Sequence, residues 1–384
     1  MRTAGIIAEF NPFHNGHRYI IETIKNTVAD SVIAVMSGSF VQRGGPAVTD
    51  KWTRACAALD AGADLVLELP VVYSMNTAQR FSRGAVEILN ACGIVDVLAF
   101  GSESGDTARL LRAARLIADE PPEVSRRIKE LSALGMNYPA ARKAAFEESA
   151  GCAIPDSPND ILAVEYLRAI YETGSEIAAE AVRRIGTAHD SENVSDGIAS
   201  ASEIRRRLMA GESTEGLLPD GGFPVYDASR LDAAVIGRIR ECGTAYLSKI
   251  NDVGEGLENR FVKAAMCADT VEALCAAVKS KRYTLSRIRR IAWSALLGLT
   301  RELCSAPPSY IRVLGMSGSG RGLLREMKKT ASLPVVIKAA DYGRAQIDPI
   351  FAANARAEDW FALCAPDAAL RRGGRDMTVS PVVR

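Results

Sequence analysis

The chain has 384 residues, 48% of them hydrophobic, which is enough to bury a large core in two or three domains. It contains no run of 18 apolar residues and no signal-peptide pattern, which argues against a membrane or secreted protein and predicts a soluble, cytoplasmic one. Lys and Arg number 47 against 46 Asp and Glu, so the overall charge leaves a nucleic-acid partner undecided.

The first predicted element is a short buried strand over 4–8, which ends just before the sequence Asn-Pro-Phe-His-Asn-Gly-His at 11–17. A turn and a helical pattern follow, so His14 and His17 lie at the mouth of a helix. Backbone N–H groups and the helix dipole favour phosphate at this position. The two imidazoles can donate hydrogen bonds to a phosphorus centre that gains negative charge. Simple capping of the helix is the alternative.

Strand patterns alternate with helical patterns through the first half of the chain. Further strands are predicted over 31–36, 63–69 and 95–100, and helices over 51–61 and 78–91. This alternation predicts an α/β fold with a Rossmann-like parallel sheet covered on both faces. Ligands of such sheets bind beyond the carboxyl ends of the strands, where 11–17, 37–45 and 101–103 fall.

A long polar and basic loop follows the second predicted strand. At the carboxyl end of a parallel sheet, such a loop is typical of a substrate lid. We predict substrate contacts for Lys51 and Arg54, which lie one helical turn apart at the end of this loop. Pairing with Asp50 and Asp60 on an exposed face is the alternative.

Single residues farther along the chain are candidates for nucleotide contacts. Gly101 follows a buried strand, where the missing side chain either admits a nucleotide or makes a plain turn. Arg184 ends an apolar stretch and either contacts phosphate or adenine or is solvated. Asn159 fits a helix cap, and His189 fits a solvated loop.

The segment from Ser200 to Arg205 predicts a capping box, in which Ser200 caps a helix and Glu203 reaches back to it. Structure alone explains that pattern. Together with Ser202 and Arg205, the same hydroxyl also favours an anion site suited to β and γ phosphates.

A Gly- and Pro-rich stretch at 217–224 marks a domain boundary. Most of the later pattern is helical, with further strands predicted over 310–314 and 334–337. We therefore predict a nucleotide-binding domain over 1–215, a mainly helical domain over 225–370 and a flexible tail over 371–384.

Residues 273–301 contain seven Lys or Arg and no Asp or Glu. Apolar residues at helical spacing would bury one face and leave a positive ridge that attracts a phosphate backbone. Tyr283 can stack on an unpaired base. We predict RNA contacts for Arg282, Arg287, Arg289 and Arg290, and a merely solvated helix face is the alternative.

Two other patterns predict no specific site. The eight cysteines form no Cys-x-x-Cys pair and have no histidine at ligand spacing, so we expect reduced thiols and no protein metal site. The glycine-rich segment 315–322 lacks the Lys followed by Ser or Thr of a P-loop, and a strand-to-helix turn is the better interpretation.

Segments 5–17, 36–44, 50–55, 281–284 and 310–315 together resemble the tRNA(Met) cytidine acetate ligase family, and His-x-Gly-His resembles the signature of the nucleotidyltransferase superfamily. With the pattern described above, this fits a nucleotidyltransferase domain followed by a mainly helical RNA-binding domain. The resemblance implies use of ATP and acetate to acetylate the N4 amine of the wobble cytidine in elongator methionine tRNA. Acetyl-adenylate is the implied intermediate, and AMP and pyrophosphate are released.

The residues themselves lead to a hypothesis for the first step, in which His14 and His17 are catalytic and Ser200, Ser202 and Arg205 hold the leaving phosphates with Mg²⁺. The resemblance adds the expected ATP contacts. No membrane and no obligate protein partner are predicted. ATP would contact Ile7, Ala8, Glu9, Phe10, Asn11, Pro12, Phe13, His14, Asn15, Gly16, His17, Arg18, Tyr19, Ile20, Gly101, Asn159 and Arg184.

Two other functions fit part of the sequence. An adenylyltransferase that moves AMP onto a small phosphate ester would explain the first half but not the basic stretch. A non-catalytic RNA-binding protein would keep the nucleotide pocket only as a sensor.

Overall fold

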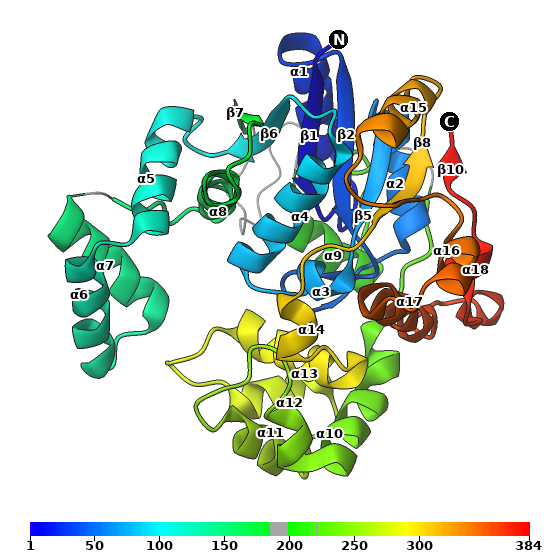
Figure 1. Ribbon diagram of the computed structural model, residues 1–384. Helices are drawn as coiled ribbons and strands as arrows, with labels where there is room; N and C mark the ends of the chain where they lie inside the picture. The colour runs from blue at the N-terminus through cyan, green and yellow to red at the C-terminus, as the bar shows by residue number, and fades with distance from the viewer. Residues whose placement is uncertain (152, 185–198, 220–221) are drawn as a thin grey trace.

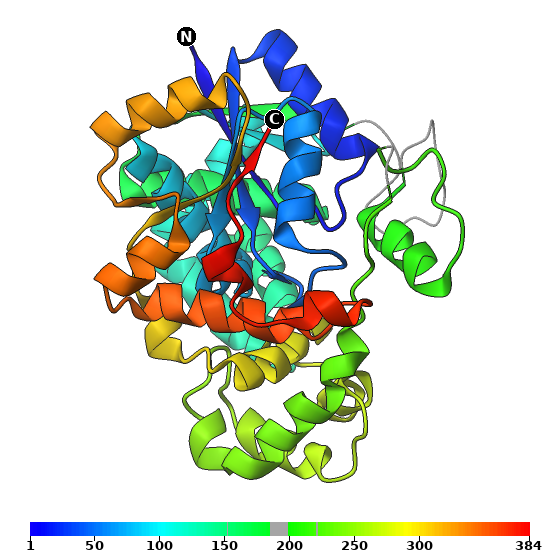
Figure 2. The same ribbon diagram turned by 90° about the vertical axis from the view of Figure 1, so that its right-hand side faces the viewer.

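The computed structural model describes residues 1–151, 153–184, 199–219 and 222–384 (Figure 1). His189 therefore lies outside the described residues. Figures 1 and 2 show a sheet flanked by helices, with a cluster of helices packed below it. The strands are β1 (Thr3–Ala8), β2 (Ser31–Ser37), β3 (Phe40–Val41), β4 (Gly45–Pro46), β5 (Leu65–Leu69), β6 (Val97–Ser102), β7 (Ala178–Arg183), β8 (Ile311–Met316), β9 (Val335–Val336) and β10 (Val382–Val383).

The main sheet has the strand order β10-β8-β5-β2-β1-β6-β7, and β9 pairs with β8. β1 is parallel to both β2 and β6, whereas β8 is antiparallel to β5. The chain runs from β1 outward through β2 to β5 and then returns to the other side of β1 with β6. The order of the strands thus reverses between β1 and β6, and such a switch point is where open α/β sheets bind ligands. This confirms the predicted α/β fold.

Helices cover both faces of the sheet because its strands are apolar on both sides. In β2, Ile33 and Val35 pack into one hydrophobic core with α4, while Val32, Ala34 and Met36 pack into a second core with α1 and α2. The helices of the first part are α1 (Asn15–Thr27), α2 (Lys51–Asp60), α3 (Val71–Ser74), α4 (Ala78–Cys92), α5 (Thr107–Asp119), α6 (Pro122–Ala133), α7 (Tyr138–Ala150), α8 (Pro158–Thr173) and α9 (Ala201–Ala210).

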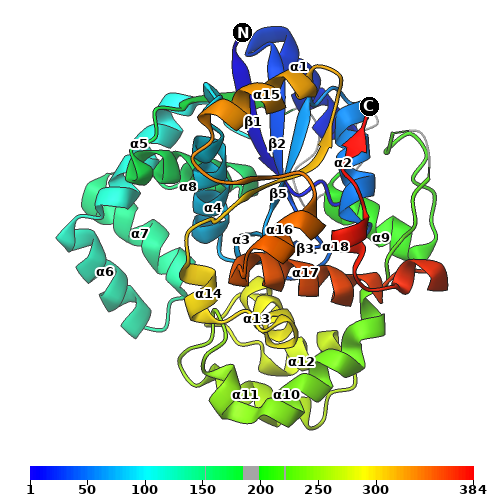
Figure 3. The same ribbon diagram turned by 45° about the vertical axis from the view of Figure 1, so that its right-hand side comes forward.

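Below the sheet, α10 to α13 form the helical cluster, and α17 lies across the junction between this cluster and α3 (Figure 3). The buried side chains of the cluster continue the same core that packs under α4. The helices of the second part are the 3₁₀ turns η1 (Ala228–Leu231) and η2 (Ala368–Arg371), and α10 (Asp232–Leu247), α11 (Leu257–Ala265), α12 (Val271–Val278), α13 (Leu285–Leu297), α14 (Arg301–Ser305), α15 (Gly320–Thr330), α16 (Ala339–Ala345), α17 (Pro349–Ala362) and α18 (Arg375–Thr378).

The sheet extends past the predicted domain limits. β8 falls within 225–370 and pairs with β5, while β10 falls within 371–384 and pairs with β8. The predicted flexible tail is therefore wrong for Val382 and Val383, because their backbone groups take part in the sheet. The residues of a strand do not reveal which distant strand it pairs with. The sequence therefore could not show that β8 joins β5 or that β10 joins β8. Among the described residues, no helix has both the length and the apolar character needed to cross a membrane.

Candidate active site

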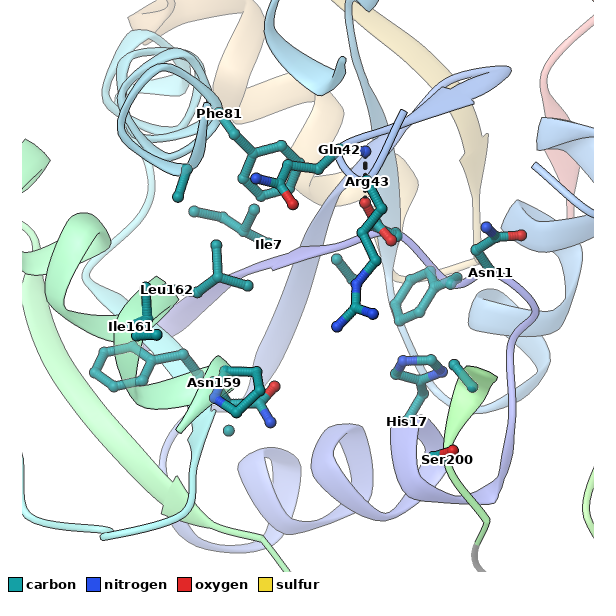
Figure 4. A pocket seen from close by; sticks show the side chains of 18 of the residues that line it. Ile7, Asn11, His17, Gln42, Arg43, Phe81, Asn159, Ile161, Leu162 and Ser200 are labelled. Carbon is teal, nitrogen blue, oxygen red and sulfur yellow. Dashed lines mark hydrogen bonds between the residues drawn. The ribbon is translucent and has the colours of Figure 1, made fainter. Parts of the chain in front are cut away.

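A cavity of about 680 Å³ opens at the carboxyl ends of β1 and β6, at the switch point of the sheet (Figure 4). Its walls come from the start of α1, from α4 and α8, from the start of α9 and from the first turns of α13. The tip of the β3–β4 hairpin closes one side. Elements from both halves of the sequence therefore meet around one space.

His14 and His17 hold the first turn of α1 together. His14 Nδ1 accepts the Gly16 N–H at 3.1 Å, and His17 Nδ1 accepts the backbone N–H of His14 at 3.2 Å. The two rings stack with their centres 3.8 Å apart, and both line the cavity. The histidines thus cap the helix and line the cavity at the same time, so the predicted capping is confirmed and the predicted contact with phosphate stays a prediction.

This capping fixes the proton positions of the imidazoles. A nitrogen that accepts a hydrogen bond from a backbone N–H carries no proton, so each neutral ring is protonated at Nε2. Burial lowers the pKa of His17 well below its usual value, and the neighbouring His14 and Arg184 lower it further. His17 is therefore a neutral hydrogen-bond donor at physiological pH.

One end of the cavity is formed after β6 and β7. Gly101 packs closely here: a Cβ on it would lie 3.1 Å from Ile20 Cδ1 and 3.3 Å from Arg184 Cγ. Asn159 Nδ2 donates to Glu103 Oε1 at 2.5 Å, and Arg184 Nη1 donates to Asn159 Oδ1 at 3.5 Å. Burial lowers the pKa of Arg184 although Glu103 partly offsets the effect. A flat polar ligand would meet an amide and a guanidinium at this end.

The opposite end is formed by the start of α9. Ser200 caps this helix by accepting the Glu203 N–H at 3.1 Å, as predicted. Glu203 itself pairs with Arg206 and Arg207, at 2.9 and 2.7 Å, so the predicted return bond of the capping box is not its role here. Arg205 donates to the Asn11 carbonyl at 2.6 Å and to Ser202 Oγ at 3.1 Å. The arrangement places a hydroxyl and a guanidinium beside the histidines.

Most of the predicted ATP-binding residues line this one cavity. Those that do are Ile7, Ala8, Glu9, Phe10, Asn11, His14, His17, Ile20, Gly101, Asn159, Arg184, Ser200 and Arg205. Those that lie outside its lining are Pro12, Phe13, Asn15, Gly16, Arg18, Tyr19 and Ser202. Asn15, for example, donates to the Gly216 carbonyl at 2.8 Å and so holds a neighbouring loop.

Lys51 and Arg54 are not at a surface where substrate or tRNA could reach them, so this prediction is wrong, as is the exposed-face alternative. Lys51 is 0% exposed, with Nζ 2.7 Å from Glu68 Oε1 and 2.5 Å from Asp376 Oδ1. Burial alone would lower the pKa of Lys51, but Asp376 and Glu68 outweigh it and raise the pKa. Arg54 donates to backbone carbonyls, including that of Glu9 at 2.8 Å, and burial lowers its pKa to about 10.

Three of the seven cations in the basic stretch 273–301 pair with carboxylates from elsewhere in the chain. Arg282 pairs with Glu255 at 2.8 Å, Arg289 with Glu272 at 2.8 Å, and Arg290 with Asp252 at 2.7 Å. In the folded protein the surface of this stretch is therefore not free of acidic groups, and the prediction of an acid-free ridge is wrong. The acidic residues come from the segment just before the stretch, which folds back onto it.

Within that stretch the individual residues differ in accessibility. Arg290 is only 7% exposed and lines the cavity, so the prediction that it contacts an RNA phosphate on the surface is wrong. Arg287 donates to the Asp252 carbonyl and lies over the ring of Tyr283. Tyr283 is buried and donates to Glu255 at 3.2 Å, so the predicted stacking on a base is also wrong.

Several cavity residues were missed in the sequence. Gln42 and Arg43 come from the predicted lid loop, but nothing in that polar segment singles them out. The apolar lining residues Phe81, Phe100, Leu162 and Tyr166 look like ordinary core residues in sequence, and Thr284 and Ser286 come from the helical cluster. Only the fold brings these side chains together.

Comparison with known proteins identifies the family. A protein-family profile described as HIGH Nucleotidyl Transferase matches residues 1–376. The tRNA(Met) cytidine acetate ligase of Acetivibrio thermocellus is 36% identical over an alignment of 415 residues that covers 100% of both chains. That of a Thermoanaerobacter species is 40% identical over 360 residues, covering 89% of this chain and 90% of its own.

Solved structures agree with this assignment. The crystal structure of Thermotoga maritima TmcAL bound with alpha-thio ATP superposes with a TM-score of 0.90 at 32% identity and covers 100% of this chain and 99% of its own. The apo form of the same protein has a TM-score of 0.92 at 32% identity, with the same coverage. The chain belongs to the HIGH nucleotidyltransferases and, within them, to the tRNA(Met) cytidine acetate ligase family.

Proposed function

We propose that this protein is an ATP-dependent ligase that activates acetate as acetyl-adenylate and transfers the acetyl group to the N4 amine of the wobble cytidine in elongator tRNA(Met). The observation that carries the proposal is the cavity at the switch point, where two imidazoles and a helix N-terminus meet, in a chain whose relatives are tRNA(Met) cytidine acetate ligases. The Thermotoga relative bound with alpha-thio ATP supports ATP as the nucleotide.

In the first step, an acetate oxygen attacks the α-phosphorus of ATP and the bond to pyrophosphate breaks. His17 and His14 would donate from Nε2 to the phosphoryl oxygens as negative charge develops there. A neutral imidazole suits this task because it keeps one N–H fixed in direction by its capping bond. Gly101, Asn159 and Arg184 would hold the adenosine end.

Ser200 and Arg205 would receive the β and γ phosphates, with Ser202 holding Arg205 in place. Mg²⁺ is part of the proposal. Within the described ranges no group of three or more His, Cys, Asp or Glu side chains is arranged to hold a metal ion. We therefore expect the phosphate oxygens to carry the ion, which would offset their charge.

In the second step, the cytidine amine attacks the acetyl carbon and AMP leaves, so positioning is the main requirement. The tRNA would approach from the helical cluster, whose residues Thr284, Ser286 and Arg290 already form part of the cavity wall. Arg282, Arg287 and Arg289 would contribute to its binding. We further propose a cytoplasmic protein that needs no obligate protein partner.

The test is incubation of the protein with ATP and labelled acetate, with and without tRNA. The proposal predicts label in tRNA together with stoichiometric AMP. Label transfer to a small phosphate-ester acceptor would instead indicate an adenylyltransferase. No turnover with any acceptor would indicate a binding protein and would overturn the proposal.

A further inference from the structure

We infer that Glu9 is the catalytic base that takes a proton from the cytidine amine in the second step. This inference rests on the proposed function and names the group that accepts a proton which the reaction has to remove. The lone pair of the cytosine amine is shared with the ring, so the amine is a weak nucleophile. When it attacks the acetyl carbon, its nitrogen carries one proton too many, and a base placed beside it speeds the reaction.

One carboxylate lies in the wall of a cavity that is proposed to bind anions. In the part of the chain that the structure describes, Glu9 is the only Asp or Glu in the lining. The cations of the same lining are Arg43, Arg184, Arg205 and Arg290. A carboxylate here repels the triphosphate and the acetate, so it weakens the binding of both substrates. A role of its own has to offset this cost.

Anchoring the β3–β4 hairpin accounts for only one of the two carboxylate oxygens of Glu9. Oε1 accepts the Gln42 N–H at 2.7 Å, which is the dashed line beside Gln42 in Figure 4. Among the described residues, none donates a hydrogen bond to Oε2. The backbone carbonyl of Glu9 accepts from Arg54 Nη1 at 2.8 Å, so the residue is held at two points. The amide oxygen of a Gln could also accept the N–H of the hairpin, so this anchor does not require a negative charge.

The other polar side chains of the lining are poor bases. His14 and His17 each use Nδ1 to accept a backbone N–H, so their Nε2 atoms already carry protons. Burial raises the pKa of Tyr166, and the nearby Glu9 raises it further, so the phenol keeps its proton. Arginine stays protonated in proteins. Within the described lining, the carboxylate of Glu9 is therefore the best proton acceptor.

The carboxylate also lies on the side of the cavity where the helical cluster begins. Glu9 bonds to the Gln42 N–H, and the Gln42 carbonyl accepts from Arg290 Nη1 of α13 at 3.5 Å. The tRNA is proposed to approach from this cluster. A cytidine that enters there would meet Glu9 before it reaches the turn that carries His14 and His17.

The proposed step moves one proton and exchanges one bond. The N4 nitrogen bonds to the acetyl carbon, and the bond from that carbon to the phosphate oxygen breaks. One proton of the amine moves to Oε2 of Glu9, and AMP leaves with the electron pair of the broken bond. Glu9 then releases the proton to solvent.

Glu9→Gln removes the base and keeps an acceptor for the Gln42 N–H. We expect the single-turnover rate of acetyl transfer to tRNA to fall about 10²- to 10⁴-fold, the usual contribution of a general base. Acetate-dependent exchange of pyrophosphate into ATP reports the first step alone and should stay within about twofold of the unmodified rate. Glu326→Gln, on the exposed face of α15, is the matched control and should change neither rate.

Hydroxylamine in place of tRNA gives a readout that a damaged cavity would also change. It is a strong nucleophile that attacks an acyl-adenylate without help from a protein base. The unmodified protein and Glu9→Gln should therefore form acetyl-hydroxamate at rates within about twofold of each other. A misplaced hairpin would slow this reaction together with acetyl transfer to tRNA.

The outcomes separate this inference from the proposed function. A Glu9→Gln variant that acetylates tRNA at the unmodified rate would overturn the inference alone. So would one that loses exchange or hydroxamate formation as strongly as transfer, since Glu9 would then serve nucleotide binding or the hairpin. An unmodified protein with neither exchange nor transfer would overturn the proposed function and this inference with it.

A second variant covers the case in which Glu9→Gln does not fold. Glu9→Asp keeps the carboxylate but withdraws it by one methylene. Acetyl transfer should then slow about 10²-fold, the scale for a catalytic group misplaced by about 1 Å, while exchange continues. Transfer by Glu9→Asp at the unmodified rate would overturn the inference.

Discussion

Two helix N-termini face the same cavity and use their polar side chains in different ways. At α1, His14 and His17 are bonded to backbone N–H groups of their own turn. At α13, Thr284 caps the helix, while Arg289 and Arg290 are bonded to carboxylates from other segments. A side chain held by its own turn keeps a defined donor toward a ligand, whereas a cation paired with a remote carboxylate has its charge offset. Proximity to the cavity is therefore not enough to make a polar group functional.

Lys51 is a third case, a cation that is completely buried and paired with carboxylates. Lys51→Met leaves Glu68 and Asp376 buried without their shared cation, and loss of one member of such a group costs about 3–5 kcal/mol. We expect the free energy of unfolding in urea to fall by that amount. Lys279→Met, on an exposed residue, is the control and should cost little. An unchanged unfolding midpoint for Lys51→Met would show that the buried ion pairs contribute no stability.

For the helix start at α1, His17→Ala tests whether the capping histidine is also catalytic. Removal of a donor to a developing negative charge lowers turnover about 10²- to 10³-fold. We therefore expect acetate-dependent AMP formation to fall by that factor, while tRNA affinity in a filter-binding assay stays the same. Full activity of this variant, with normal folding shown by its melting temperature, would leave His17 with only its capping role.

The low pKa of His17 predicts a pH effect on stability. Its pKa is below 6.5 in the folded protein, so the unfolded chain binds more protons as the pH falls through 6.5. The unmodified protein should therefore lose stability below that pH, by about 1 kcal/mol per pH unit until the folded pKa is reached. His17→Asn lacks this group and should show a shallower loss between pH 7.5 and 5.5 in urea titrations. Equal slopes for the two proteins would mean that His17 titrates normally.

The smallest expected effect concerns the paired cations at α13. Glu272→Gln removes the carboxylate partner of Arg289 and exposes its charge. If tRNA passes over this surface, affinity should rise about two- to fivefold, and the salt dependence of binding should steepen by about one phosphate contact. Glu326→Gln, on α15, provides the control with an exposed ion pair of the same length. No change for Glu272→Gln would place the tRNA path elsewhere.

The features that could be predicted from the sequence are those set by residues close together in the chain. The strand-turn-helix unit around His14 and His17, and the cap at Ser200, depend on residues within a few positions of each other, and both form as expected. The antiparallel pairing of β8 with β5 and the burial of Lys51 depend on residues hundreds of positions away. The basic stretch is paired over shorter separations, 17 positions for Arg289 with Glu272 and 38 for Arg290 with Asp252, but these partners still lie outside the stretch itself. Counting charges along a sequence cannot include such partners.

The central claim is that both imidazoles hold the phosphates of ATP in the cavity between β1 and β6. A crystal structure of this protein with a non-hydrolysable ATP analogue tests it most directly. We predict phosphate oxygens within hydrogen-bond distance of Nε2 of His14 and His17, and adenosine beside Gly101, Asn159 and Arg184. A nucleotide bound in another part of the molecule, or phosphates that touch neither histidine, would contradict the claim.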